Sequence, residues 1–369
     1  MKAPEILKFE TAAVLAPGEN NPRNSEGDFA VLNDGRILFA YSRYHGESGR
    51  DDAPCDIAAL VSSDGGRSFE PLGRFPATAE EHRTLNIMSV SQKRLDTGEL
   101  CLFYLCKRGP RSEVYLKRCV DEKNVVFGEP ELIVPAHKSI YYVINNCRVA
   151  KLDDGSLILP LARHKIVKRP NGSKSGEYFG TCCFYRGGPD GRDFYMEQKI
   201  LKMKNPGYSE TGLQEPGVSV LPDGRLYAYF RTDRCFQFES FSEDGGKTWT
   251  APSPSRFTSP DSPMLIMRNP YSGVYYSVWN PVPNYNGRID KTKRWINAGR
   301  TPFVIAASEN GLDFSDFTVL ENDPDKGYCY PAMLFLSETE LLLSYCAGGE
   351  EDGTCLSKTV IKRVTLGKE

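Results

Sequence analysis

The chain has 369 residues, which allows one large domain or two average ones, so length alone does not decide the domain count. A formal net charge of -2 gives no indication of a nucleic-acid partner or of an anionic membrane surface. The first ten residues, MKAPEILKFE, lack the apolar segment of a secretory signal, and no run approaches the roughly 18 apolar residues of a membrane-spanning helix.

The eleven cysteines are odd in number and contain no Cys-x-x-Cys pair. This usage favours reduced, mostly buried thiols over a disulfide framework or a zinc site. We therefore expect a cytoplasmic protein that needs no metal and no other cofactor. Its oligomeric state is left open.

One unit recurs six times along the chain: a strand, a tight turn and an aromatic-rich strand. The copies are AVLNDGRILFAYSR (30–43), KRLDTGELCLFYLC (93–106), AKLDDGSLILPLAR (150–163), SVLPDGRLYAYFR (219–231), RNPYSGVYYSVWN (268–280) and LFLSETELLLSY (334–345). Six copies leave about sixty residues each, the size of a four-stranded blade with its loops. Because helical periodicity is almost absent, the sequence predicts an all-β, six-bladed β-propeller that forms one domain over residues 1–369.

The remaining segments are assigned by what a ring of blades requires. Residues 5–15 and 359–366 both have strand patterns, and pairing them in one blade would remove the open edge that a ring cannot leave exposed. Four long segments lack the repeat, and we expect them to be loops over one face, where propellers place binding residues: 44–56, 164–180, 199–213 and 281–299.

The octapeptide from Ser242 to Trp249, SEDGGKTW, is an Asp box, a tight hairpin that shapes a blade and does no catalysis. An aspartate caps backbone donors, two glycines take conformations closed to other residues, and the tryptophan packs beneath. A good copy lies at 62–69, a weaker one at 308–314 and a degenerate one at 188–194. These copies are in phase with the strand repeat and support the propeller independently.

The strand before this box has a strict period of two, which predicts that one face packs and the other presents chemistry. The packing face would hold Leu226, Ala228 and Phe230. The face that presents chemistry would hold Tyr227, Tyr229 and Arg231.

Charged and aromatic residues stand at strand ends and in the loops beside them. In chain order they are Arg23 in NPRNSE, Asp51 and Asp52 in GRDDAP, Glu215 and Arg231 around the fourth unit, Arg300 in GRTPF and Tyr330 in GYCYP. Arg231 ends the strand that follows Glu215, Arg300 precedes the box at Ser308 by eight residues, and Tyr330 follows Arg300 by thirty.

This ordered set resembles the sialidase superfamily, the exo-acting neuraminidases of cellular organisms, over nearly the whole chain. The resemblance implies that Arg23, Arg231 and Arg300 clamp a substrate carboxylate. It further implies that Tyr330 is a nucleophile activated by Glu215, and that Asp52, in Asp-Ala-Pro, is the acid/base. The expected function is a retaining exo-glycosidase that removes a terminal α-keto acid sugar such as sialic acid from a glycan.

Elementary electrostatics agrees with this assignment. Three guanidinium groups about 6 Å apart would repel by roughly 2 to 3 kcal/mol per pair at an effective dielectric near 20. Such a cluster needs an anion between its members, and the planar fork of arginine fits a carboxylate. A neutral phenol also approaches an anionic sugar without the repulsion that a carboxylate nucleophile would meet.

Several alternatives stay open. Asp51 competes with Asp52 for the acid role, Tyr328 competes with Tyr330, and Glu26 is a candidate partner for Arg23 or for substrate. His45 and His164 are at strand ends, and Asn86, Asn145 and Asn146 begin the second and third units. After Arg23 the chain has Asn-Ser-Glu-Gly-Asp where the family usually has Ile-Pro. This departure motivates two other hypotheses: a glycosidase or lyase for another acidic sugar, such as a uronate, and a carbohydrate-binding propeller without turnover.

Overall fold

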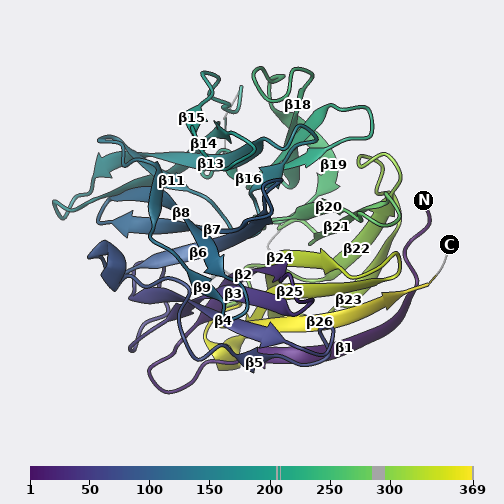
Figure 1. Ribbon diagram of the computed structural model, residues 1–369. Helices are drawn as coiled ribbons and strands as arrows, with labels where there is room; N and C mark the ends of the chain where they lie inside the picture. The colour runs from purple at the N-terminus through teal and green to yellow at the C-terminus, as the bar shows by residue number, and fades with distance from the viewer. Residues whose placement is uncertain (205–206, 208, 285–295, 368–369) are drawn as a thin grey trace.

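The computed structural model describes residues 1–204, 207, 209–284 and 296–367. Six antiparallel sheets surround a common centre, with β2 and β24 near the middle of the ring and β5 and β15 at its rim (Figure 1). The prediction of an all-β, six-bladed propeller is confirmed. Among the described residues, no helix is long and apolar enough to span a membrane.

The blades follow one another along the chain. The first has β2 (Asn24–Val31), β3 (Ile37–Tyr44), β4 (Cys55–Ser62) and β5 (Glu70–Pro71). The second has β6 (Ile87–Arg94), β7 (Leu100–Arg108), β8 (Arg111–Asp121) and β10 (Glu131–Val134), with β9 (Val126–Phe127) beside β8. The third has β11 (Ile140–Val143), β12 (Ala150–Lys151), β13 (Leu157–Lys168), β14 (Lys174–Gly187) and β15 (Tyr195–Met196).

The fourth blade has β16 (Gln214–Val220), β17 (Leu226–Arg231), β18 (Phe236–Ser242) and β19 (Ser253–Thr258). The fifth has β20 (Leu265–Arg268), β21 (Tyr275–Trp279), β22 (Phe303–Ser308) and β23 (Phe317–Glu321). The sixth has β24 (Lys326–Phe335), β25 (Glu340–Gly349), β26 (Lys358–Leu366) and β1 (Ile6–Leu15). Two short 3-10 helices, η1 (Glu80–His82) and η2 (Glu350–Asp352), lie in loops.

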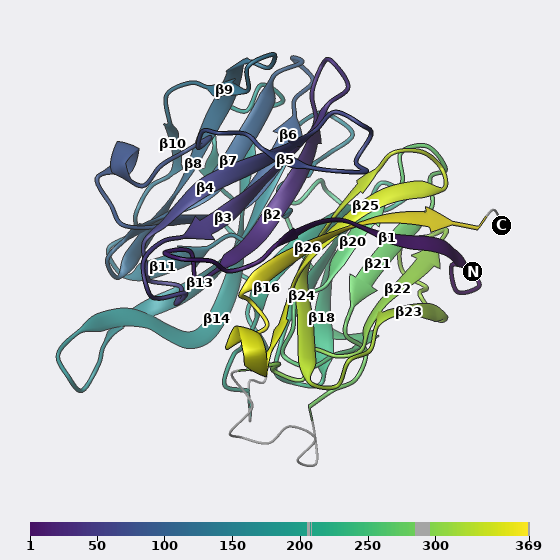
Figure 2. The same cartoon turned by 90° about the horizontal axis from the view of Figure 1, so that it is seen from below.

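Strands from the two ends of the chain share the sixth blade. β1 pairs antiparallel with β26, with Val14 opposite Val360, and the two strands run side by side in Figure 2. The hydroxyl of Thr359 also donates to the backbone oxygen of Asn24 in the first blade, at 2.9 Å. The last blade is therefore built from both ends of the chain and is tied to the first, which joins the ring.

Both faces of the fourth blade are packed, so the prediction that one face of β17 presents chemistry is wrong. Leu226, Ala228 and Phe230 pack with side chains of the third blade, whereas Tyr227 and Tyr229 are buried against the fifth. The reason is that a sheet inside a ring has a neighbouring sheet on each side. Only the end of the strand reaches the central pocket, which is where Arg231 stands.

The Asp boxes have the expected hydrogen bonds. In the box of the fourth blade, Asp244 accepts from the backbone nitrogen and the hydroxyl of Thr248, at 2.8 and 2.6 Å. Gly245 and Gly246 have φ of 69° and 96°, which suit glycine. The indole of Trp249 lies over Phe184 of the third blade, with centroids 4.3 Å apart and rings 19° from parallel. This box therefore fixes a hairpin and contributes to the packing between the third and fourth blades.

The expected loop at 164–180 is instead a β-hairpin. β13 continues to Lys168 and β14 starts at Lys174, with Ile166 opposite Gly176, and the hairpin extends beyond the body of the ring (Figure 2). Most of its side chains are exposed or half-buried, so the alternating pattern that reveals a strand is missing there. The segment 44–56 does connect β3 to β4. Parts of 199–213 and 281–299 lie outside the described residues.

Candidate active site

A β-bulge at the same place on four inner strands builds the floor of the central pocket. The strand register breaks at Glu26, Ser89, Glu215 and Tyr330, which have positive φ of 56°, 62°, 47° and 52°. Side chains other than glycine rarely adopt this conformation, and functional sites hold many of the exceptions. All four side chains line one pocket of about 960 Å³.

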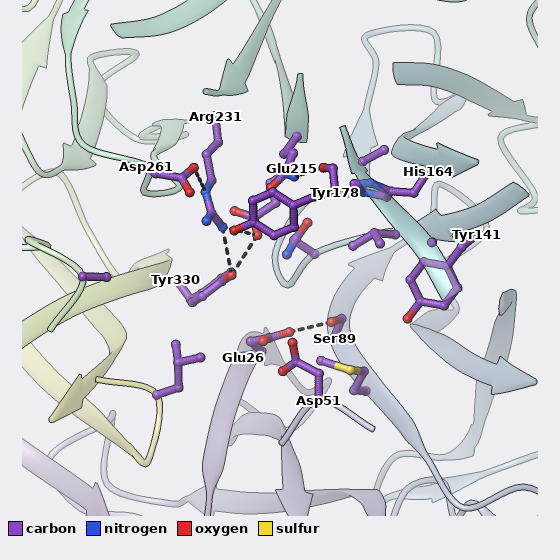
Figure 3. A pocket seen from close by; sticks show the side chains of 18 of the residues that line it. Glu26, Asp51, Ser89, Tyr141, His164, Tyr178, Glu215, Arg231, Asp261 and Tyr330 are labelled. Atoms are coloured by element: carbon purple, nitrogen blue, oxygen red, sulfur yellow. Dashed lines mark hydrogen bonds and ion pairs between the residues drawn. The ribbon is translucent and has the colours of Figure 1, made fainter. Parts of the chain in front are cut away.

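All six blades contribute to this pocket, so it lies where they converge. The lining includes Glu26 and Asp51 from the first blade, Ser89 and Lys107 from the second, Asn145 and His164 from the third, Glu215 and Arg231 from the fourth, Arg300 from the fifth, and Tyr330 and Cys355 from the sixth. Asp261, in the loop between the fourth and fifth blades, also lines it. Figure 3 shows two groups that face each other across it. Arg231, Glu215 and Tyr330 form one group, and Glu26, Ser89 and Asp51 form the other.

The first group joins a phenol to a carboxylate and a guanidinium. The Tyr330 hydroxyl donates to Glu215 Oε1 at 2.7 Å, and Arg231 Nη1 donates to the same oxygen at 2.7 Å (Figure 3). Arg231 Nη1 is also 3.4 Å from the Tyr330 oxygen. Burial and then the charge of Glu215 raise the pKa of Tyr330 well above its usual value, against the opposing effects of Arg231 and Arg300. The phenol is therefore neutral at rest, with a proton acceptor in place.

The second pocket arginine, Arg300, lies over the tyrosine ring. Its guanidinium carbon is 5.6 Å from the ring centroid of Tyr330, and its Nη2 donates to the backbone oxygen of Asp261 at 3.3 Å. The Asp261 carboxylate accepts from Arg231 Nε at 2.6 Å. Asp261 thus links both arginines to one loop of the fourth and fifth blades. Arg300 Nε is buried and has no hydrogen-bond partner within the described part of the chain.

Two thiols complete the surroundings of Arg300. Its Nη1 is 3.1 Å from Cys329 Sγ and 3.9 Å from Cys355 Sγ. A hydrogen bond with Cys329 and the charge of Arg300 lower the pKa of Cys355 below the usual range of a thiol, whereas burial raises that of Cys329. All eleven cysteines of the chain are free. Cys355 therefore has a lowered pKa and also lines the pocket.

Arg23 does not join the other two arginines in the pocket lining. It is only 2% exposed, and its Nη1 donates to Asp51 Oδ1 at 2.6 Å. Its Nη2 donates to Glu26 Oε1 at 2.9 Å, and its Nε to Ser25 Oγ at 2.8 Å. Arg231 and Arg300 of the predicted clamp line the pocket, and the part of Arg23 in that clamp stays a prediction. Glu26 and Asp51 of its own blade pair with Arg23, just as Glu215 and Asp261 pair with Arg231.

Both residues of the doubled aspartate line the pocket, but their surroundings differ. Burial raises the pKa of Asp51, but Arg23 and Lys107 outweigh it and lower that pKa to about 2. The carboxylate is thus surrounded by protein charges, although 68% of the side chain still faces the open pocket. Asp52 is 77% exposed, and its Oδ1 accepts from Arg50 Nε at 3.4 Å. The geometry favours Asp51 over Asp52 as the residue of this pair that meets a ligand.

Tyr328, the alternative nucleophile, belongs to the core. It is 4% exposed, its ring stacks on Phe303 with centroids 6.3 Å apart, and it also contacts Tyr345. Strand alternation alone would place Tyr328 and Tyr330 on the same face. The bulge at Tyr330 changes the direction of that side chain, which separates a packed tyrosine from one in the pocket.

The two histidines differ in position. His164 lines the pocket, its Nδ1 is 3.0 Å from the backbone oxygen of Glu177, and burial lowers its pKa. His45 is instead paired with Asp56 at 2.7 Å, away from the pocket lining. His164 is therefore a neutral polar group beside the site, and His45 stabilises a neighbouring loop.

The asparagines mostly hold other residues in place. Asn86 donates to the backbone oxygens of Ala53 and Asp51, at 2.6 and 3.1 Å, which fixes the aspartate loop. Asn146 donates to the backbone oxygen of Tyr330, at 3.2 Å, and to that of Gly27. Asn145 lines the pocket directly.

Two functional candidates escaped the sequence reasoning. Ser89 occupies the same position in its blade as Glu26, Glu215 and Tyr330, six residues before the first turn residue of the repeat unit. Comparing the repeats at that position would have found it. Asp261 lies in a loop between blades and no pattern in the sequence marks it.

A family model described as a BNR repeat-like domain matches residues 74–343. The chain belongs to this family. No curated protein matches the chain. Among the described residues, no three His, Cys, Asp or Glu side chains are grouped to hold a metal ion.

Solved structures resemble this BNR repeat-like domain in fold. A protein of unknown function from Dyadobacter fermentans has a TM-score of 0.69 at 14% identity, over 98% of this chain and all of the other. A sialidase from Streptococcus pneumoniae has a TM-score of 0.68 at 12% identity, over 97% of this chain and 70% of the other. An α-L-arabinanase from Penicillium chrysogenum has a TM-score of 0.61 at 12% identity, over 98% of each. The sialidase-like propeller fold is thus established.

Proposed function

We propose that this protein is a retaining exo-glycosidase that removes a terminal α-keto acid sugar, sialic acid first and a related ulosonic acid second. One observation carries the proposal: the hydroxyl of Tyr330 donates to Glu215 at 2.7 Å, beside Arg231 and Arg300. In this pocket a phenol is paired with a base, and arginines lie beside them. This arrangement suits a phenol that attacks the anomeric carbon of a sugar with an adjacent carboxylate.

Glu215 activates the phenol in this mechanism. As the Tyr330 oxygen bonds to the anomeric carbon, Glu215 takes its proton, and Arg231 stabilises the negative charge that passes between them. Because the pKa of the buried phenol is raised, the tyrosine needs this base. A neutral nucleophile avoids repulsion with the anionic sugar, which a carboxylate at the same place would not.

Arg231 and Arg300 are the proposed carboxylate ligands. Arg300 has a buried Nε with no hydrogen-bond partner among the described residues, so it can donate to an added anion. Arg23 keeps Glu26 and Asp51 in position instead of touching substrate. The leaving oxygen takes its proton from a carboxyl group on that opposite wall, where Asp52 is more exposed than Glu26 or Asp51.

The test is release of 4-methylumbelliferone from its sialic acid conjugate by the purified protein. We expect turnover by the wild type, almost none by Tyr330→Phe, and a product that first appears with the anomeric configuration of the substrate in an NMR time course. Equal rates in wild type and Tyr330→Phe would refute the mechanism.

A second candidate is hydrolysis or lyase cleavage of another acidic sugar, such as a uronate. The enclosure of Arg23 favours it, because two arginines define a carboxylate position less tightly than three. Turnover of uronate-capped glycans where sialosides show none would select this candidate. Tight sialoside binding without hydrolysis at any pH would select a binding protein instead.

A further inference from the structure

We propose that Glu26, rather than either aspartate of the β3–β4 loop, is the general acid that protonates the leaving oxygen. The inference rests on the proposed function and names a catalytic residue for it. Glu26 is 4% exposed and lines the pocket from the bulge of β2. It holds the same position in its blade as Glu215 and Tyr330 hold in theirs, and Figure 3 shows it across the pocket from Glu215.

The two oxygens of Glu26 have different partners, which decides where a proton can reside. Oε1 accepts from Arg23 Nη2 at 2.9 Å, and a guanidinium has no acceptor to offer in return. Oε2 accepts from the Ser89 hydroxyl at 2.5 Å, and that hydroxyl can rotate and accept a hydrogen bond instead. A protonated Glu26 therefore carries its proton on Oε2, on the side of Ser89, which also lines the pocket.

Charges around Glu26 favour its protonated form over that of Asp51. Burial raises the pKa of Glu26, the negative charges of Asp51 and Glu215 add to this effect, and Arg23 and Ser89 oppose it. Other titratable groups that act on Glu26 are Tyr44, Cys55, Tyr141, Tyr330 and Cys346. Asp51, whose pKa is about 2, has lost its proton at neutral pH. A general acid must hold a proton at the operating pH.

Two carboxyl groups, Glu26 and Glu215, move all the protons of the reaction. In the first step Glu26 gives its proton to the glycosidic oxygen while the bond from that oxygen to the anomeric carbon breaks. The Tyr330 oxygen forms its bond to this carbon and loses its proton to Glu215. In the second step Glu26 takes a proton from water as the water oxygen attacks the anomeric carbon, and Glu215 returns the proton to the departing Tyr330.

The experiment compares leaving groups in Glu26→Gln and in the matched control Asp51→Asn. For a sialoside with an unactivated sugar alcohol as leaving group, Glu26→Gln should lower kcat/KM by about 10²- to 10⁴-fold. For the 4-methylumbelliferyl conjugate, whose leaving group needs little protonation, the loss should be under about tenfold. Asp51→Asn should affect both substrates equally. The basic limb of the pH profile should disappear in Glu26→Gln only.

Ser89→Ala provides a second measurement that keeps the carboxyl group, in case Arg23 without its partner weakens folding. Removing this donor should raise the pKa of Glu26, because the Ser89 hydrogen bond lowers it. The basic limb of kcat/KM should therefore move to higher pH, whereas a merely structural Glu26 would leave it in place.

The possible results distinguish a wrong role for Glu26 from a wrong function for the whole protein. Equal losses for both substrates in Glu26→Gln, or a leaving-group-dependent loss in Asp51→Asn, would overturn the role of Glu26 and leave the glycosidase intact. An unmoved basic limb in a folded Ser89→Ala would also overturn it. No turnover of any substrate by the wild type would refute the glycosidase and the inference together.

Discussion

Replacing Glu215 by glutamine tests whether Glu215 and Tyr330 act as one unit. The substitution preserves side-chain volume but leaves the phenol beside an amide, which cannot take its proton. General-base catalysis contributes about 10²- to 10⁴-fold to a rate, which corresponds to roughly 2.7 to 5.4 kcal/mol of transition-state stabilisation. We therefore expect kcat/KM of Glu215→Gln to fall within that range for the 4-methylumbelliferyl sialoside.

The folded state should tolerate this change better than the chemistry does. Arg231, the cation beside Glu215, keeps its 2.6 Å ion pair with Asp261. The loss is then one charge-assisted hydrogen-bonding partner, about 1.5 to 3 kcal/mol per bond. Urea denaturation followed by tryptophan fluorescence measures this cost, and rates are compared only under conditions where both variants are folded.

A double-mutant cycle gives the decisive comparison. In Tyr330→Phe the proton that Glu215 would accept is already gone, so adding Glu215→Gln should change the residual rate by less than about threefold. Fully additive losses in the double variant would mean that the two residues act in separate steps. That result would refute the activated-phenol mechanism even if both single variants were nearly inactive.

Three further predictions concern other parts of the molecule. Asp52→Ala should keep kcat/KM within about threefold of wild type, since its side chain is largely exposed and has few contacts to lose; a loss above a hundredfold would return the acid role to Asp52. Cys355 is buried but lines the pocket, and its pKa is lowered, so iodoacetamide should alkylate it at pH 7 faster than the other buried thiols and abolish turnover; peptide mass spectrometry locates the adduct, and Cys355→Ser should be resistant to the inactivation. Trp249→Ala should cost about 3 to 5 kcal/mol of unfolding free energy, because the indole is buried between two blades; a cost under about 1 kcal/mol in urea denaturation would contradict the packing role of the Asp box.

The fold could be predicted because its signals are local and repeated. A turn such as Pro222-Asp223-Gly224-Arg225 between alternating residues identifies a hairpin without knowledge of the rest of the chain. The box from Ser242 to Trp249 does so through hydrogen bonds within eight residues. Six such units in phase leave few architectures that could contain them. The β13–β14 hairpin was missed because its half-exposed strands lack that local signal.

The candidate site was predictable only in part, because side-chain direction depends on contacts between blades. Glu215 and Tyr330 are 115 residues apart in the chain, and their 2.7 Å contact requires a bulge on each of two strands. Nothing in the residues around Tyr328 and Tyr330 indicates which of them lies on the bulge. The position within the repeat does, since Tyr330 aligns with Glu26, Ser89 and Glu215.

The position of Arg23 depends on the same bulge. The bulge at Glu26 places its carboxylate 2.9 Å from Arg23, and Asp51 reaches the same guanidinium from the β3–β4 loop. Arg231 also has two anionic partners and still lines the pocket, so the ion pairs of Arg23 account for where its guanidinium lies and do not by themselves exclude a ligand. Exchanging Glu26 for a neutral residue removes one of the partners of Arg23. The residue three positions after Arg23 therefore contributes to where this guanidinium lies relative to the pocket.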